Sequence, residues 1–236
     1  PEKFTSLDKQ QTNKFITKFG EEFDRITKRI DTGNFEVLFS HLLSLLQRFT
    51  WCIPSNTKDE YPDVSLYDHL RTTSAICGCL YQYHKDGNFD QNSIIDSNTD
   101  KFRLVLGDIS GIQKYIFEIA GIGVGGVAKR LRARSMYLSA LAEAISHKII
   151  HDFNLPISNI IMSAGGKFYV LVPNLAGSED KINELQEQLD YWFVKSYYGE
   201  LSLNLAQLPF NGSEFGSFGE ILAATAARLN QRKKTP

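Results

Sequence analysis

The sequence predicts an α+β fold, in which a helical N-terminal module is followed by a ferredoxin-like domain of order β-α-β-β-α-β. Two patterns predict it. Apolar residues recur every three or four positions in residues 1–84, as in amphipathic helices. After residue 101, short runs of branched and aromatic residues alternate with helical segments. At 236 residues the chain is long enough for one large domain or two small ones.

Composition and cysteine usage limit the classes of protein to consider. With 26 basic and 27 acidic residues the net charge is −1, so any affinity for polyanions must come from local clusters. Cys52, Cys77 and Cys79 form no CxxC pair and suit a reducing cytoplasm better than a disulfide framework. We expect Cys77 and Cys79 to be buried in a helix and His84 to lie at the surface. No signal peptide or membrane-length apolar run is present, so a cytoplasmic protein without membrane contact is predicted.

Residues 1–84 are predicted to form the helical module. Between residues 6 and 30 one apolar stripe is formed by Phe15, Ile16, Phe19, Phe23, Ile26 and Ile30. Residues 35–49 are more apolar and are expected to be buried on most sides. Ser65 to Asp68 has the form of a capping box that opens a helix running through Tyr83.

Two pairs of neighbouring acidic and histidine residues raise the alternative of a metal-dependent phosphohydrolase. Such a site needs several His and Asp ligands that converge from different helices, with a His-Asp dipeptide among them. Asp68-His69 has the opposite order and lies in the predicted cap, where Asp68 favours the positive end of the helix. His151-Asp152 lies just past a predicted helix end without evident companions. We therefore interpret both pairs as structural.

Residues 85–101 are polar and rich in turn-forming residues, and are predicted to be a linker. The ferredoxin-like domain, residues 102–210, has predicted strands at 102–107, 157–163, 167–172 and 201–208, and helices at 111–119, 126–150 and 178–197. Ala164-Gly165-Gly166 is a hairpin signal between the second and third strands. The helices of such a unit lie on one face, so we expect the other face of the sheet to be free for a partner. Residues 211–236 are predicted to be a tail that leads to a further domain outside this chain.

A glycine cluster and a basic helix start follow the first strand. Gly121, Gly123 and Gly126 match the dinucleotide-binding fingerprint, but the next strand ends without the carboxylate of a Rossmann unit, so a flexible loop is favoured. Four cations crowd the first turns of the following helix: Lys129, Arg130, Arg132 and Arg134. Cations there oppose the helix dipole, which suggests a bound anion such as nucleotide or RNA phosphate. A solvated basic face is the alternative, and the two are equally favoured.

Asp108 directly follows the first predicted strand, and the fold places this end of the strand beside the central hairpin. Nucleotide cyclases and palm polymerases carry metal-binding carboxylates at these two places. Here the hairpin, Ser163 to Lys167, has a lysine and no carboxylate, and one aspartate alone is a poor two-metal site. Its glycines would let backbone amides approach a phosphate, with Lys167 as a point charge. The pattern predicts a half-site that holds a nucleotide while catalytic carboxylates come from elsewhere.

Four stretches carry a resemblance to a known family. GDISGIQKYIF at 107–117, KRLRARS at 129–135 and SAGGKF at 163–168 follow the order of the first Palm domain in the large subunit of type III-A (Csm-type) CRISPR effector complexes. WCIPSNTKDEYPDVSLYDHLRTTSAI, at 51–76, resembles the segment between that family's N-terminal HD domain and this Palm. The resemblance implies that the ferredoxin-like domain is a Palm domain of the cyclase-like type.

The resemblance implies activities that belong to the whole family chain. That chain has an HD domain that cuts single-stranded DNA, a four-cysteine zinc module, two Palm domains and a C-terminal helical domain. A Gly-Gly-Asp-Asp turn in its second Palm polymerises ATP, with Mg or Mn, into cyclic oligoadenylates when target RNA is bound. The present sequence lacks the HD metal motif, the four zinc cysteines and the Gly-Gly-Asp-Asp turn. Alone it is therefore expected to be neither nuclease nor cyclase.

The resemblance also implies partners and a nucleotide site. The partners are the crRNA 5′-end subunit, the small subunit and the backbone subunits, together with crRNA and target RNA. The positions that match those facing bound ATP are Asp108, Ser110, Gly111, Ser163, Gly165, Gly166 and Lys167. The expected role is the non-catalytic half of an ATP pocket and a scaffold for assembly, with no catalytic or metal-ligating residue of its own.

Two alternatives to this role stay open. The first is a degenerate Palm that only docks protein or RNA. The second is a free-standing nucleotide cyclase, which would need a second hairpin carboxylate that the sequence lacks.

Overall fold

The computed structural model describes residues 9–30, 33–56, 58, 63–87, 89–117 and 126–233. The chain divides into two compact units, Pro1–Thr73 and Ser74–Pro236. This division falls inside a helix, whereas the sequence patterns place the end of the helical module at residue 84. No helix in the described part of the chain is long and apolar enough to cross a membrane.

The first unit is helical, as predicted. It contains α1 (Lys9–Arg29), α2 (Phe35–Thr50) and the start of α3 (Leu66–His84). The apolar stripe of α1 packs on α2, where the ring centroids of Phe15 and Phe19 lie 5.1 and 5.4 Å from that of Phe49 in edge-on contacts. Phe49 is buried, so these ring contacts form the centre of the pair.

Ser65 caps the start of α3, but Asp68 contacts the Ser65 hydroxyl and not the Ser65 backbone N–H of a full capping box. The Ser65 hydroxyl oxygen accepts a hydrogen bond from the Asp68 backbone N–H at 3.0 Å, and the hydroxyl donates to Asp68 Oδ2 at 2.8 Å. The Asp68 carboxylate therefore serves the helix terminus. This confirms the structural interpretation of Asp68-His69.

The second unit contains a four-stranded antiparallel sheet in the order β2-β3-β1-β4. Its strands are β1 (Phe102–Ser110), β2 (Ile160–Ala164), β3 (Lys167–Pro173) and β4 (Ser202–Phe210). Its main helices are α5 (Ile112–Phe117), α6 (Val127–Asp152), α7 (Ser178–Tyr197) and α8 (Phe218–Arg232), and its 3-10 turns include η3 (Ile157–Asn159) and η4 (Gly212–Ser217). This confirms the ferredoxin-like order. β1 is longer than predicted, and the residues predicted to begin the second strand form η3.

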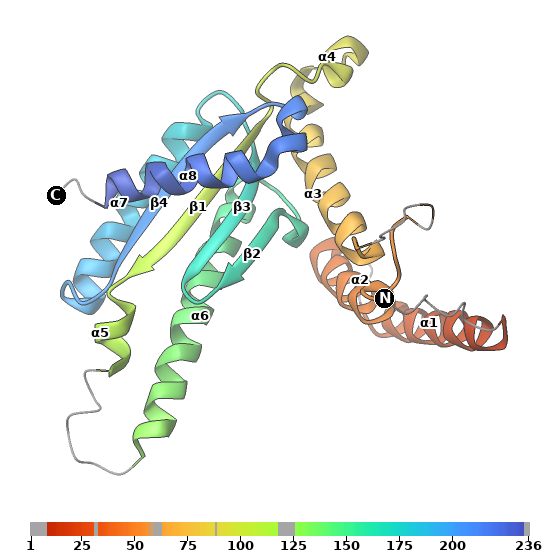
Figure 1. Cartoon of the computed structure of the whole chain (residues 1–236), viewed down its shortest axis with the longest axis horizontal. Coiled ribbons are helices and arrows are strands. Elements are labelled where there is room, and N and C mark those ends of the chain that lie inside the picture. The colour runs from red at the N-terminus through yellow and green to blue at the C-terminus, as the bar shows by residue number, and fades with distance from the viewer. Residues whose placement is uncertain are drawn as a thin grey trace. The chain divides into compact units, whose positions relative to one another are not determined.

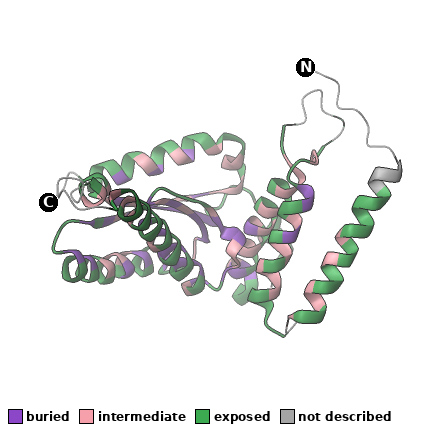
Figure 2. Ribbon diagram, turned by 90° about the horizontal axis from the view of Figure 1, so that it is seen from below, coloured by how far each residue is buried: buried purple, intermediate pink, exposed green. Residues whose placement is uncertain are grey.

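Helices α6 and α7 cover one face of the sheet (Figure 1). On this face the buried Arg103 of β1 donates from Nη1 to Gln207 Oε1 of β4 at 2.9 Å and lies 3.6 Å from Glu179 Oε2 of α7. Burial lowers the pKa of the Arg103 guanidinium, and Glu179 opposes the shift. Buried residues concentrate on the strands and on the helix faces turned toward them (Figure 2). The sheet is therefore the centre of the core.

The opposite face is covered by α8, which crosses β1 and β4 (Figure 1). Leu229 of α8 packs against Leu106 of β1 and Ala206 of β4. The expectation that this face is free was therefore wrong over β1 and β4. Residues 218–232 carry apolar side chains at helical spacing, and Ile221 and Leu229 are buried. Docking of the helix removes apolar strand residues from water, which is why the tail is not an extended connection.

The predicted linker, residues 85–101, is bound to the second unit. It contains the 3-10 turn η1 (Lys85–Gly87) and α4 (Gln91–Ile95). The buried Lys101 ammonium donates to the backbone carbonyls of Ser93, Ile94 and Asp96. The Lys101 carbonyl accepts from the Asn174 backbone N–H at 2.9 Å. These bonds hold the segment directly before β1.

Two burial expectations for α3 were wrong. Cys77 is exposed, because it lies about 200° around the helix from Cys79, which is buried and donates to the Leu171 carbonyl at 3.5 Å. Burial raises the pKa of the Cys79 thiol. His84 is buried at 5% exposure, and its Nε2 has no hydrogen-bond partner among the described residues. Burial, helped by the charge of Lys101, lowers the pKa of the His84 imidazole.

Candidate functional site

The end of β1 and the β2–β3 hairpin adjoin, as the sequence predicts. Asp108 of β1 lies directly opposite Lys167 of β3 in the antiparallel register. The Ile109 backbone N–H donates to the Gly166 carbonyl at 2.9 Å. Directly opposed residues place their side chains on the same face of a sheet. Asp108 and Lys167 are therefore neighbouring residues on the face that α8 covers.

The hairpin turn depends on its two glycines. Gly165 and Gly166 have φ values of +61° and +87°, which is the two-residue turn that matches the twist of the strands. A Cβ on Gly166 would lie 2.4 Å from Ile112 Cδ1, whereas a Cβ on Gly165 would meet open space. Gly165 is exposed, so its peptide group is accessible to a ligand.

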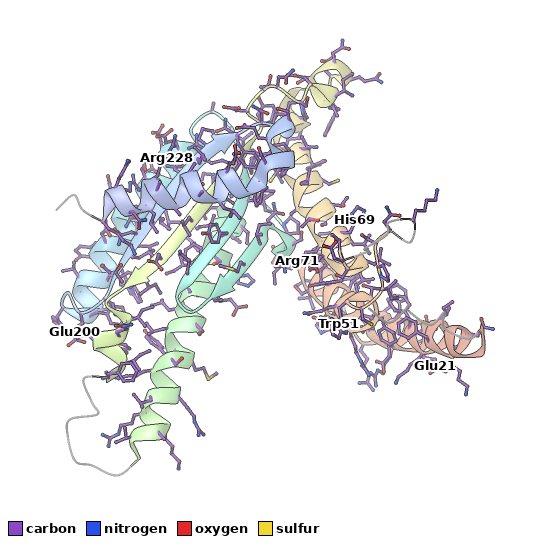
Figure 3. All side chains as sticks on the ribbon, viewed as in Figure 1. Glu21, Trp51, His69, Arg71, Glu200 and Arg228 are labelled. Carbon is purple, nitrogen blue, oxygen red and sulfur yellow. The ribbon has the colours of Figure 1, made fainter. Side chains whose placement is uncertain are left out.

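The backbone conformation and the packing at position 111 require a glycine. Its φ is +89°, and a Cβ there would lie 2.1 Å from the backbone carbonyl oxygen of Glu200. Figure 3 shows Glu200 at the end of the sheet where α5 begins. Gly111 therefore permits the close approach of two backbone segments. Ser110 precedes it, opposite Ser202 at the start of β4.

Ser163 lies on the other face of the sheet from Lys167. It pairs with Phe168, which also pairs with Gly107, so all three share the face of α6 and α7. The cause is the two-residue turn, which pairs Ala164 with Lys167 and therefore Ser163 with Phe168. Because successive residues of a strand point to opposite faces, Ser163 and Lys167 lie on different faces. The structure thus brings Asp108 and Lys167 together and places Ser163 apart from them.

Two polar residues near Asp108 were missed by the sequence analysis. Asn204 of β4 lies directly opposite Asp108, so Lys167, Asp108 and Asn204 form one row across three strands. The alternation of polar and leucine residues from Leu201 to Leu208 carries this signal, because a period of two assigns Asn204 to the face away from α7. Lys233, the residue after α8, forms an ion pair with Asp108 Oδ2. No local sequence pattern predicts the contact between Lys233 and Asp108, which are 125 residues apart.

The basic helix start divides into two kinds of residue. Lys129, Arg130 and Arg132 are exposed on the first turns of α6. Arg134 donates to the Tyr115 carbonyl oxygen, and its guanidinium lies 4.5 Å from the centroid of the Tyr115 ring. Arg134 therefore ties α6 to α5, and three cations stay available to an anion.

The glycine fingerprint lies mostly outside the described residues. Gly121 and Gly123 belong to the part of the chain that the structure leaves undescribed. Gly126 is described and caps α6 with a φ of +90° and no side-chain hydrogen bond. Its positive φ accounts for a glycine at that position without a ligand.

The described residues contain no group of three or more His, Cys, Asp or Glu side chains that could hold a metal ion. His151 and Asp152 are the last two residues of α6, not residues beyond its end, and the Asp152 carboxylate accepts from Lys148 Nζ at 2.5 Å. The carboxylate thus stabilises the end of the helix. Asp108 has Lys233 as its partner, so its carboxylate is not part of a ready metal site.

Comparison with known proteins shows the family to which this chain belongs. Residues 101–236 match the family model described as Csm1 subunit domain B. The chain belongs to the Csm1 family. A curated relative, the CRISPR system single-strand-specific deoxyribonuclease Cas10/Csm1 (subtype III-A) of Methanocaldococcus jannaschii, is 32% identical over 222 residues, which are 84% of this chain and 27% of the relative. The chain therefore spans about a quarter of the length of that relative.

Solved structures of Csm1 confirm the fold. The Csm1–Csm4 cassette in complex with cA4 matches 99% of this chain and 31% of the solved chain, with a TM-score of 0.82 and 26% identity. The same cassette in complex with one ATP matches 93% of this chain and 29% of the solved chain, with a TM-score of 0.75 and 25% identity. The predicted resemblance to the type III-A large subunit is thus confirmed, and so is the α+β fold.

Proposed function

We propose that this chain is the first Palm portion of a type III-A CRISPR large subunit, and that the end of β1 with the β2–β3 hairpin forms the non-catalytic half of an ATP pocket. The observation that carries the proposal is the juxtaposition of an accessible glycine turn and Lys167 with the end of β1. It is supported by the similarity of nearly the whole chain to relatives solved with one ATP and with cA4.

The residues of this site fit a phosphate group. Gly165 is exposed and has no side chain, so a phosphate oxygen can approach its backbone. Lys167 supplies an ammonium next to it, which binds phosphate as a point charge. ATP would then be held and oriented here, while the transfer chemistry is supplied by the second Palm of the complete protein.

The same residues do not fit Mg or Mn. Asp108 is the one carboxylate in the row, and it is ion-paired with Lys233. Divalent metals of this type need several oxygen ligands. Any metal that accompanies ATP would therefore take its carboxylates from another part of the complete subunit.

The proposed partners follow from the relatives and from local charge. The solved relatives are cassettes of Csm1 with Csm4, and we propose an equivalent subunit, with the small and backbone subunits, as neighbours of this cytoplasmic chain. Lys129, Arg130 and Arg132 are exposed on the part of α6 that extends past the sheet with α5 (Figure 1). Three cations on an exposed helix suit the phosphates of crRNA or target RNA.

A docking module without nucleotide binding is the second candidate. It is favoured by an exposed stripe at the C-terminal end of α7, where Tyr191 and Val194 of the helix and Tyr198 directly after it are 72%, 65% and 91% exposed. Large exposed aromatic residues are typical of protein interfaces. Under this candidate the stripe would carry the function, and ATP affinity would be absent.

The test is ATP binding and cyclic oligoadenylate synthesis by the complete effector complex. Lys167→Ala should weaken ATP binding about tenfold, since a hydrogen bond to a charged group is lost, and should lower synthesis while RNA binding is unchanged. Ser163→Ala should have a smaller effect, because Ser163 lies on the opposite face. Lys18→Ala, which removes an exposed lysine of α1, is the matched control. Unchanged ATP affinity in Lys167→Ala would remove the hairpin from the pocket.

A further inference from the structure

The sheet face under α8 changes from apolar to polar at one row. Leu106 of β1 and Ala206 of β4 lie under Leu229 of α8. Two residues further along β1, Asp108 lies between Lys167 and Asn204. The helix ends at Arg232, so it covers the apolar rows and stops where the polar row begins. The residue that follows the helix is placed over that row.

Lys233 reaches the row from the end of α8. Its backbone N–H donates to the Leu229 carbonyl at 3.1 Å, which fixes the start of its side chain. Its ammonium pairs with Asp108 Oδ2, and the two side chains are 29% and 22% exposed. A cation at a helix C-terminus is also favoured by the dipole. The ammonium is thus held at one place and still reached by solvent.

The charges of the row decide what it can bind. Lys167 and Asp108 alone would cancel, and an uncompensated Asp108 carboxylate would repel a phosphate. Lys233 makes the row cationic, with two lysine residues and one carboxylate. An ammonium has three N–H donors, so Lys233 can keep its bond to Asp108 and donate to a phosphate oxygen.

We propose that Lys233 is a second phosphate-binding cation of the ATP half-site, and that Asp108 is the positioning residue that holds it there. The proposal rests on the proposed ATP site and deepens it. It gives Asp108 a role different from that of a metal-binding carboxylate. It also makes the end of α8 a part of the pocket.

The experiment measures the affinity of the complete effector complex for ATP and for adenosine. Lys233→Ala should weaken ATP binding about tenfold and leave adenosine binding unchanged, because adenosine has no phosphate. Lys233→Arg should retain most of the affinity for ATP. Thermal unfolding of each variant complex shows whether the fold is intact, and Lys18→Ala again controls for the loss of a lysine.

The role of Asp108 is tested by whether a second substitution raises or lowers the affinity for ATP. In the Lys233→Ala background, Asp108→Asn should recover part of the ATP affinity, since it removes the carboxylate that Lys233 no longer neutralises. A further loss in this double variant would overturn the positioning role, because it would mean that the carboxylate itself serves the ligand.

The failures of the two proposals are distinguishable. If Lys167→Ala weakens ATP binding and Lys233→Ala does not, the role of Lys233 is overturned and the ATP half-site stands. If neither variant changes ATP affinity, both proposals are overturned.

Discussion

His84 closes α3 with its imidazole in the interior of the second unit. Burial and the neighbouring charge of Lys101 lower its pKa below 6.5, and the opposing effect of Asp90 is smaller. The unfolded chain therefore binds more protons than the folded chain as the pH falls below 6.5. The contribution of His84 to stability is complete above that pH and is lost as the pH falls through the lowered, folded-state value.

We expect the melting temperature of the chain to fall between pH 7 and pH 5. In the His84→Gln variant this fall should be smaller. Glutamine does not titrate, so the proton linkage disappears. Thermal scans across this pH range measure the slope. His151→Gln removes a histidine whose side chain is 80% exposed and serves as the control. A slope that is equal in the wild type and in His84→Gln would contradict the assignment.

Asp108 and Ser163 show which features of the candidate site the sequence can predict and which it cannot. The pairing of Asp108 with the hairpin could be predicted, because the order of elements places the end of β1 beside the turn. The orientation of Ser163 could not be predicted, because it depends on the length of the turn, and Ala164-Gly165-Gly166 is compatible with two or three turn residues. A three-residue turn would pair Ser163 with Lys167 on one face. In the structure Ala164 belongs to β2 and the turn has two residues, so Ser163 pairs with Phe168 on the other face.

Among the elements, α8 has the largest effect on the surface of the sheet. It buries the face of β1 and β4 that the sequence analysis expects to be free. The apolar spacing of residues 218–232 is visible in the sequence, but where a helix docks depends on which strand side chains face outward. The helix was therefore predictable as an element, and its place on the sheet was not.

Leu229→Ala tests how firmly α8 is held. Leu229 is 2% exposed and packs on Leu106 and Ala206, so the substitution should cost about 2 kcal/mol or more of the free energy of unfolding. Urea denaturation of the chain gives this difference from the midpoint at constant slope. Asn230→Ala changes the exposed neighbour on the same helix and should stay within about 0.5 kcal/mol of wild type. An equal effect of the two substitutions would mean that α8 is not docked through Leu229.

At the scale of the whole second unit, the sheet has an edge at β4 that other chains could extend. The outward carbonyls of this strand are occupied by side chains. Arg228 and Arg232 of α8 donate to the carbonyls of Gln207 and Leu205 at 2.9 and 2.6 Å, and Figure 3 shows Arg228 on α8. Gln186 of α7 donates to the Leu203 carbonyl and accepts from the Leu205 N–H. Two helices thus protect an edge strand from pairing with another chain.

Removing this protection should promote self-association. The double variant Arg228→Ala/Arg232→Ala should form larger species at lower protein concentration than wild type, as measured by light scattering. Arg130→Ala/Arg132→Ala removes the same charge from an exposed helix face and should leave the size distribution unchanged. Equal association of the two variants would attribute the effect to net charge and not to the strand edge.

The lysine that precedes β1 has a mechanical consequence. Its ammonium binds three carbonyls in and just after α4, and its own carbonyl is bonded to the residue after β3. Because of these bonds, α4 is mechanically coupled to β1. A rotation of α4 would displace Lys101 and, with it, Phe102 at the start of β1. β1 runs nine residues from that point through Asp108. A displacement of α4 is therefore expected to reach the end of the sheet that carries Asp108 along the strand itself.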